Sequence, residues 1–308
     1  MMALAQGALR GSYPPIVTPF RDGRVDLETF ASLVDRQARL GSHGIVVCGT
    51  TAEPSSLTVS ERADLLRVAV DASARRIPVV AATGSQSLAE TLDLTTRAEQ
   101  AGADAVLVVT PYYIRPPQAG LVEYFAEVGR STSLPLLIYH IPGRAAVSVT
   151  VDTVARIADR APNLVGMKHA VNDLEFVTEV LARLGREFRV FCGLEALSLP
   201  MLVVGGAGVM NAVGNVAPDR VAALCNAVDA GSLAEARRLH DELFELNQAL
   251  FLDTNPIPLK HMMARLGLLP SPDVRLPLVP ITDEARKSRL DDVLRRAGLL
   301  TAPVSLAQ

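Results

Sequence analysis

Short apolar runs, rich in β-branched residues, recur along the chain and alternate with longer amphipathic stretches. The eight runs begin at Pro14, Gly44, Pro78, Ala105, Pro135, Leu164, Phe188 and Ala207. Each run is continuously apolar, which is typical of a parallel strand covered on both faces by helices. The stretches between them carry helix-start signals, such as the capping-box spacing of Thr58 and Glu61 ahead of "RADLLRVAV". The pattern predicts an alternation of strands and helices.

Both a doubly wound sheet and a (β/α)8 TIM barrel are α/β folds that fit this alternation. Eight strands within roughly 200 residues favour the barrel, and no Gly-x-Gly-x-x-Gly turn follows the first run. We therefore predict a catalytic barrel over residues 13–220. Residues 221–301 contain the helical patterns "AEARRLHDELFELNQALF" and "IPLKHMMARLGLL", and we expect these helices to pack on the barrel or on a neighbouring subunit.

The composition is that of an ordinary soluble protein. Of the 308 residues, 49% are hydrophobic, and the net charge is −3 without a cluster of Lys or Arg. This balance argues against nucleic-acid or membrane-surface partners and favours small-molecule substrates. A run without charged residues extends from Ala196 to Pro218, but prolines, glycines and asparagines interrupt it. We therefore do not expect this run to span a membrane.

Two further features predict a cytoplasmic location. The N-terminal stretch "MMALAQGALRGSYPP" lacks the basic opening and the apolar segment of a secretory signal. The three cysteines, Cys48, Cys192 and Cys225, lie far apart without paired spacing, as expected of reduced core residues.

In a TIM barrel the loops that follow the strands converge around one pocket, so the ends of the apolar runs are candidate site positions. These ends are Thr18, "GTTAEP", Thr83 with Gly84, "TPYYIRP", "YHIPGR", Lys168, "CGLE" and Asn211. One amine, several hydroxyls, three tyrosines and an arginine are therefore expected in one cavity.

The chemistry of this set centres on Lys168. Desolvation at an apolar strand end disfavours the ammonium form, so its pKa is expected to fall and the neutral amine to attack a carbonyl, giving a Schiff base. Tyr139 and Tyr113 could move protons to and from the imine if the hydroxyls of Thr50 and Thr51 link them. A strand-end lysine in a structural ion pair is the plainer alternative for Lys168 alone.

An anionic keto acid fits the rest of the set. Backbone amides and hydroxyls of the "GTT" loop could hold one carboxylate, and the guanidinium of Arg144 a second. The five histidines make no metal-ligand spacing, and no phosphate-binding or nucleophile-elbow motif occurs, so neither a metal nor a cofactor is expected.

Several ordered motifs resemble one enzyme family over nearly the whole chain, from about Tyr13 to Leu300. They are "GTTAEP", "VTPYYIRPPQAGLVEYF", "LIYHIPGR", "GMKHA" and "NPIPLKHMMARLGL". The chain resembles the dihydrodipicolinate synthases and N-acetylneuraminate lyases, which are pyruvate-dependent class I aldolases. The resemblance implies the TIM barrel and a homotetramer built as a dimer of dimers.

The resemblance also implies roles for single residues. Lys168 would form the imine with pyruvate, Tyr139 would donate and accept the proton beside it, and Thr50 would link Tyr139 to Tyr113 of a neighbouring subunit. Thr51 would hold the pyruvate carboxylate. The backbone around Met210 and Gly193 would close the pocket, and Arg144 would bind the carboxylate of the second substrate.

Arg144 favours the branch of the family that condenses pyruvate with L-aspartate 4-semialdehyde to 4-hydroxy-tetrahydrodipicolinate, in lysine and diaminopimelate biosynthesis. Departures leave alternatives open, since Ala52, Pro54, His140 and His169 stand where that branch usually has other residues. The alternatives are a catabolic aldolase or dehydratase acting on a 2-keto-3-deoxy acid, an N-acetylneuraminate lyase-like enzyme, and a non-catalytic effector-binding barrel.

Two finer expectations follow. The segment "SLTVSER" has no histidine where lysine-inhibited relatives carry one, although Glu90 and Tyr112 match, so lysine is expected to inhibit weakly or not at all. Alternation along the strand should turn His169 away from Lys168, toward the surrounding helices.

Overall fold

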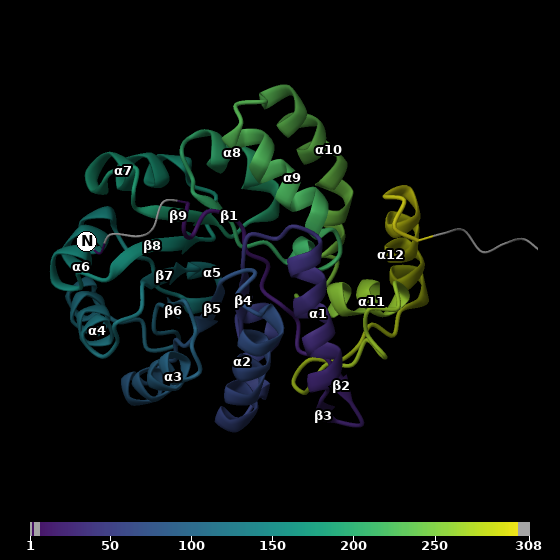
Figure 1. Ribbon diagram of the computed structural model, residues 1–308, viewed down its shortest axis with the longest axis horizontal. Helices are drawn as coiled ribbons and strands as arrows, with labels where there is room; N and C mark the ends of the chain where they lie inside the picture. Colours follow the sequence, from purple (N-terminus) through teal and green to yellow (C-terminus); the bar gives the residue numbers. More distant parts are fainter. Residues whose placement is uncertain (1, 3–6, 301–308) are drawn as a thin grey trace, which may run out of the picture.

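The computed structural model describes residue 2 and residues 7–300, and these form a closed parallel barrel surrounded by helices (Figure 1). Its eight strands are hydrogen-bonded in the order β1-β10-β9-β8-β7-β6-β5-β4, and a parallel bridge from Pro15 to Val46 joins the two ends of the sheet. The predicted (β/α)8 fold is confirmed. Thr301, the last residue of the predicted helical region, and most of the N-terminal stretch lie outside the described residues.

The strands are short, and each is followed by a helix on the outside of the barrel. The strands are β1 (Gly11–Ser12), β4 (Ile45–Val47), β5 (Val79–Ala82), β6 (Ala105–Val109), β7 (Leu136–His140), β8 (Leu164–His169), β9 (Arg189–Cys192) and β10 (Gly208–Val209). The outer helices are α1 (Leu27–Arg39), α2 (Val59–Ser73), α3 (Leu88–Gln100), α4 (Gln118–Arg130), α6 (Val151–Arg160), α7 (Leu174–Leu184), α8 (Ser198–Val203) and α9 (Pro218–Asp229). Helix α2 begins with the predicted capping box between Thr58 and Glu61.

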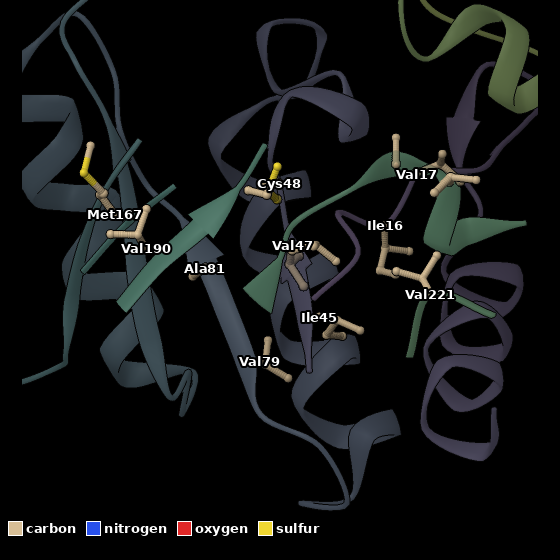
Figure 2. Close-up of a cluster of buried hydrophobic side chains, with 14 of the residues drawn as sticks. Ile16, Val17, Ile45, Val47, Cys48, Val79, Ala81, Met167, Val190 and Val221 are labelled. Carbon is tan, nitrogen blue, oxygen red and sulfur yellow. The ribbon is translucent and has the colours of Figure 1, made fainter. Parts of the chain in front are cut away.

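Side chains of the strands divide into two apolar layers because neighbouring residues point to opposite faces. One layer lies between the strands and the helices; Figure 2 shows Ile45 and Val47 of β4 and Met167 of β8 in it. The other layer fills the barrel and includes Tyr139 and Met210. This division decides which residues at the strand ends can reach a central pocket.

The first and last predicted strands differ from what forms. The run from Ala207 contributes only β10, and a 3-10 turn, η4 (Ala212–Asn215), follows it. The Asn215 amide donates to the carbonyl oxygens of Pro15 and Ala212 at 2.8 and 3.0 Å, so side-chain bonds replace the strand ladder there. The first barrel strand, β1, lies ahead of the run that begins at Pro14, and that run joins the barrel through the Pro15 bridge. Its last residue, Phe20, opens a two-stranded hairpin, β2 (Phe20–Arg21) with β3 (Arg24–Val25), that was not predicted.

Three more helices lie beside the barrel, on the right in Figure 1: α10 (Leu233–Ala249), α11 (Ile257–Arg265) and α12 (Glu284–Arg296). Helix α10 packs on α8 and α9, and α11 contacts the η4 turn that follows the last barrel strand. Within residues 7–300, no helix combines the length and the apolar character that crossing a bilayer demands.

Candidate active site

Lys168 and Tyr139 lie side by side at the ends of two neighbouring strands. The register of β7 and β8 places Tyr139 directly opposite Lys168, and both side chains are buried. The Lys168 Nζ lies 4.4 Å from the centre of the Tyr139 ring. Among the described residues, none forms a hydrogen bond or ion pair with this amine, so its lone pair or proton is available to a ligand.

The "GTT" loop reaches the same point from β4. Thr50 opens a short 3-10 turn, η1 (Thr50–Ala52), and its Oγ1 lies 3.3 Å from the Tyr139 Oη, where either hydroxyl could donate. The Thr18 Oγ1 donates to the Ala52 carbonyl at 2.7 Å and supports this turn from below. The Thr50 hydroxyl therefore meets the Tyr139 hydroxyl, and Thr18 holds the turn that carries Thr50.

A segment more than 200 residues away fixes the same loop. The Asn255 amide donates to the Thr51 Oγ1 at 3.0 Å. The carboxylate of Glu53, whose backbone is left-handed at φ 58°, pairs with the Lys260 Nζ at 2.5 Å and accepts the Arg275 backbone N–H at 3.0 Å. Burial lowers the pKa of Lys260 to about 8 despite this partner.

The Arg275 side chain also holds the segment that follows the "GTT" loop. Its guanidinium donates to both carboxylate oxygens of Glu61 at 2.9 and 2.7 Å and to the Ser56 carbonyl at 3.0 Å. We call residues 273–278 the strap. Sequence reasoning assigned no role to Asn255, Lys260 or Arg275, although the first two belong to the "NPIPLK" motif that supported the family resemblance.

Gly193 lies next to the Lys168 side chain, and Met210 lies inside the barrel. A Cβ atom built on Gly193 would approach the Lys168 Cε to 2.9 Å, so this position leaves room for the lysine. The Met210 side chain belongs to the layer inside the barrel, and its N–H donates to the Cys192 carbonyl at 2.8 Å. Beyond it, the buried carboxylate of Glu195 accepts the Ala212 N–H at 2.8 Å, and burial raises its pKa.

A cleft of about 540 Å³ opens above Tyr139. Thr50, Tyr112, Glu90 and Arg144 line it, and Arg144 projects from a short helix, α5 (Pro142–Ala145). The cleft has the size of a small-molecule site. Arg144 and Tyr139 therefore line the same cleft, and the Lys168 amine lies over the Tyr139 ring.

Not every predicted position reaches the cleft. Tyr113 is 85% exposed with a left-handed backbone (φ 72°), so this chain does not bring it to Tyr139. Thr83 is buried and accepts a hydrogen bond from Thr95 of α3, and the Asn211 amide donates to Ser198 of α8. Thr83 and Asn211 therefore do not line the cleft as expected, because their side chains form hydrogen bonds to the helices outside the barrel.

His140 and His169 lie behind the site, on the outer face of the barrel. His169 is turned away from Lys168 and stacks on Phe176 of α7, with ring centres 4.7 Å apart. The predicted orientation is confirmed. Within the described residues, no three His, Cys, Asp or Glu side chains cluster as a metal site.

One protein family matches nearly the whole of this sequence. Residues 8–296 match the dihydrodipicolinate synthetase family. The 4-hydroxy-tetrahydrodipicolinate synthase of Thermus thermophilus is 48% identical over 292 residues, which cover 94% of this chain and 97% of that protein.

Solved structures agree with this match. Dihydrodipicolinate synthase from Aquifex aeolicus superposes with a TM-score of 0.93 at 37% identity, covering 96% of this chain and all of that one. The chloride-inhibited synthase of Acinetobacter baumannii, solved in complex with pyruvate, gives a TM-score of 0.91 at 33% identity, covering 95% and 100% of the two chains.

Proposed function

The chain belongs to the dihydrodipicolinate synthetase family, and we propose that it condenses pyruvate with L-aspartate 4-semialdehyde to give 4-hydroxy-tetrahydrodipicolinate. The observation that carries this proposal is the buried amine of Lys168, which has no partner among the described residues and lies over the ring of Tyr139, a residue that lines the cleft. The relatives named above share this activity by name. The enzyme is a Schiff-base-forming lyase of the class I aldolase type.

The first steps need an amine and a proton carrier. The neutral Lys168 Nζ attacks the C2 carbonyl of pyruvate, and loss of water leaves an imine. The protonated imine withdraws electrons, so a C3 proton can leave and an enamine forms. We assign this proton transfer to Tyr139, whose hydroxyl exchanges protons with Thr50 3.3 Å away.

The enamine carbon then attacks the aldehyde of the second substrate, and the new alkoxide takes a proton from Tyr139. The amino group of that substrate attacks the imine carbon, which closes the ring and frees Lys168. We assign the pyruvate carboxylate to Thr51 and to backbone groups beside Gly193 and Met210. The second carboxylate is assigned to Arg144, whose guanidinium lines the cleft and can bind it through two parallel hydrogen bonds.

The test separates the mechanism from the substrate. Sodium borohydride added with pyruvate should reduce the imine and leave a pyruvyl adduct on the peptide that contains Lys168, as read by mass spectrometry. Turnover of aspartate semialdehyde should exceed that of a panel of 2-keto-3-deoxy acids and N-acetylneuraminate. If the adduct forms but a 2-keto-3-deoxy acid or N-acetylneuraminate is turned over faster than aspartate semialdehyde, the Schiff-base mechanism stands and the synthase assignment is rejected.

We also propose that the enzyme is a cytoplasmic homotetramer, a dimer of dimers in which Tyr113 completes the relay of a neighbouring subunit. The exposed side chains of Tyr113 and Ile114 support this assignment, because large apolar groups at a loop tip favour a covered surface. Sedimentation velocity on the purified chain should give a tetramer. A fully active monomer would contradict the shared relay.

Inhibition by lysine is expected to be weak. Glu90 and Tyr112 line the cleft, but the charged residues of the "SLTVSER" segment are engaged elsewhere. Glu61 is held by Arg275, and the Arg62 guanidinium donates to the Ala82 carbonyl at 2.9 Å. A submillimolar inhibition constant for lysine would overturn this expectation.

A further inference from the structure

We propose that His140 and His169 act as a positioning pair, whose mutual hydrogen bond sets the spacing of Tyr139 and Lys168 and anchors the loop that follows the short helix carrying Arg144. The inference rests on the proposed function. Each histidine directly follows one of the two residues at the reaction centre, and the strand register pairs the histidines with each other, just as it pairs Tyr139 with Lys168.

The hydrogen bonds of the pair determine where its protons lie. The Val149 N–H donates to the His140 Nε2 at 3.3 Å, so this nitrogen carries no proton. A neutral His140 is then protonated on Nδ1, which lies 3.2 Å from the His169 Nδ1 and donates to it. His169 must therefore be protonated on Nε2, which is a buried atom.

This arrangement has no place for an additional proton. A proton on the His140 Nε2 would face the Val149 N–H, and one on the His169 Nδ1 would face the N–H of His140. Burial lowers the pKa of both imidazoles to about 4, and the proximity of the two rings adds to the effect at His140. The one charged group acting on both rings among the described residues is Asp173, the N-cap of α7, which favours protonation.

The pair connects three parts of the site. His140 extends β7, His169 extends β8, and Val149 lies in the loop after α5, the short helix that carries Arg144. Phe176 of α7 packs on both rings, with ring centres 4.7 Å from His169 and 5.4 Å from His140. Both histidines are buried, so the pair cannot touch the substrate. Its effect must pass through the groups that it holds.

Two substitutions at one position separate hydrogen bonding from packing. His169→Phe keeps a ring against Phe176 but removes the acceptor for His140, whereas His169→Asn loses the ring but keeps an oxygen acceptor near the Nδ1 position. We expect His169→Phe to lower kcat about tenfold, because a small misplacement of reacting groups is costly. His169→Asn should keep kcat within about twofold while lowering the melting temperature.

The opposite order, with His169→Asn the less active of two folded variants, would reject the positioning role, because a purely structural ring predicts that order. Should His169→Phe fail to fold, nitrogen-15 NMR of the wild-type imidazoles decides. The proposal requires His140 protonated on Nδ1 and His169 on Nε2, and any other pair of tautomers rejects it. The borohydride adduct of the wild type tests the proposed function separately, so failure of one proposal is not failure of the other.

Discussion

Two lysines are buried in this protein, and they occupy contrasting surroundings. Lys168 ends a barrel strand, lies over the Tyr139 ring and has no ionic partner among the described residues. Lys260 lies within α11, pairs with the Glu53 carboxylate at 2.5 Å and donates to the Asp273 carbonyl at 2.7 Å. One amine is left open to a ligand, and the other is consumed by the protein.

The comparison shows that a perturbed lysine is not by itself a nucleophile. Burial lowers the pKa of Lys260 to about 8, yet its donors already point at Glu53, Asp273 and the face of the Phe20 ring. What distinguishes Lys168 is an amine without a polar partner among the described residues, next to the Tyr139 and Thr50 hydroxyl pair. We therefore expect loss of Lys168 to abolish chemistry and loss of Lys260 to weaken the fold and the loop that it supports.

The largest effect should come from Lys168→Ala. Without the amine neither the imine nor the enamine forms, so condensation should fall at least about 1,000-fold, and the borohydride adduct should vanish. The melting temperature should change little or rise, since a buried amine without an ionic partner is removed. A pyruvyl adduct on another residue of this variant, in particular on Lys260, would contradict the assignment of Lys168 as the nucleophile and of Lys260 as a structural group.

Lys260→Met should produce the largest loss of stability. The substitution leaves the buried Glu53 carboxylate without its cation, and breaking such a pair costs about 3 to 5 kcal/mol of unfolding free energy. Urea unfolding followed by circular dichroism measures it. Arg238→Gln is the matched control, because its pairs with Glu235 and Glu242 are exposed and should contribute less than about 1 kcal/mol. Equal losses of unfolding free energy in the two variants would show that the buried Lys260–Glu53 ion pair stabilises the fold no more than an exposed pair does.

Tyr139→Phe should act on chemistry alone. The ring that covers the Lys168 amine remains, but the hydroxyl that meets Thr50 is gone, so kcat should fall about 100-fold through loss of acid–base catalysis. Pyruvate should still form the borohydride adduct, more slowly. Thr50→Val is the companion variant, with a smaller loss expected because Tyr139 keeps its own proton. A wild-type kcat in Tyr139→Phe would remove Tyr139 from the relay.

The same contrast explains which parts of the molecule could be predicted from the sequence. Lys168 and Tyr139 were predictable, because apolar periodicity gives the strands, and the barrel rule then places their ends together. The strap was not, because the contact of Arg275 with Glu61 spans 214 residues and depends on how two loops fold back. His140 and His169 were visible as departures, but their mutual hydrogen bond required the strand register. The short β10 escaped prediction because the Asn215 side-chain bonds are not encoded in hydrophobic periodicity.

The smallest predicted effect tests whether the strap is held to the rest of the protein by the ion pair between Arg275 and Glu61. The fork from Arg275 lowers the pKa of Glu61 from its ordinary 4.5 to about 2. Below pH 4.5 Glu61 is protonated in the unfolded chain but still ionised in the folded chain. The stability that this ion pair contributes is therefore lost as the pH falls. Between pH 7 and pH 4, the wild type should lose about 1 kcal/mol more unfolding free energy than Glu61→Gln, which has no carboxylate to protonate. Denaturant titrations at both pH values measure the difference. Parallel losses in the two proteins would mean that Arg275 holds the loop through its bonds to the Ser56 and Gly23 carbonyls, and that the strap depends on backbone contacts rather than on charge.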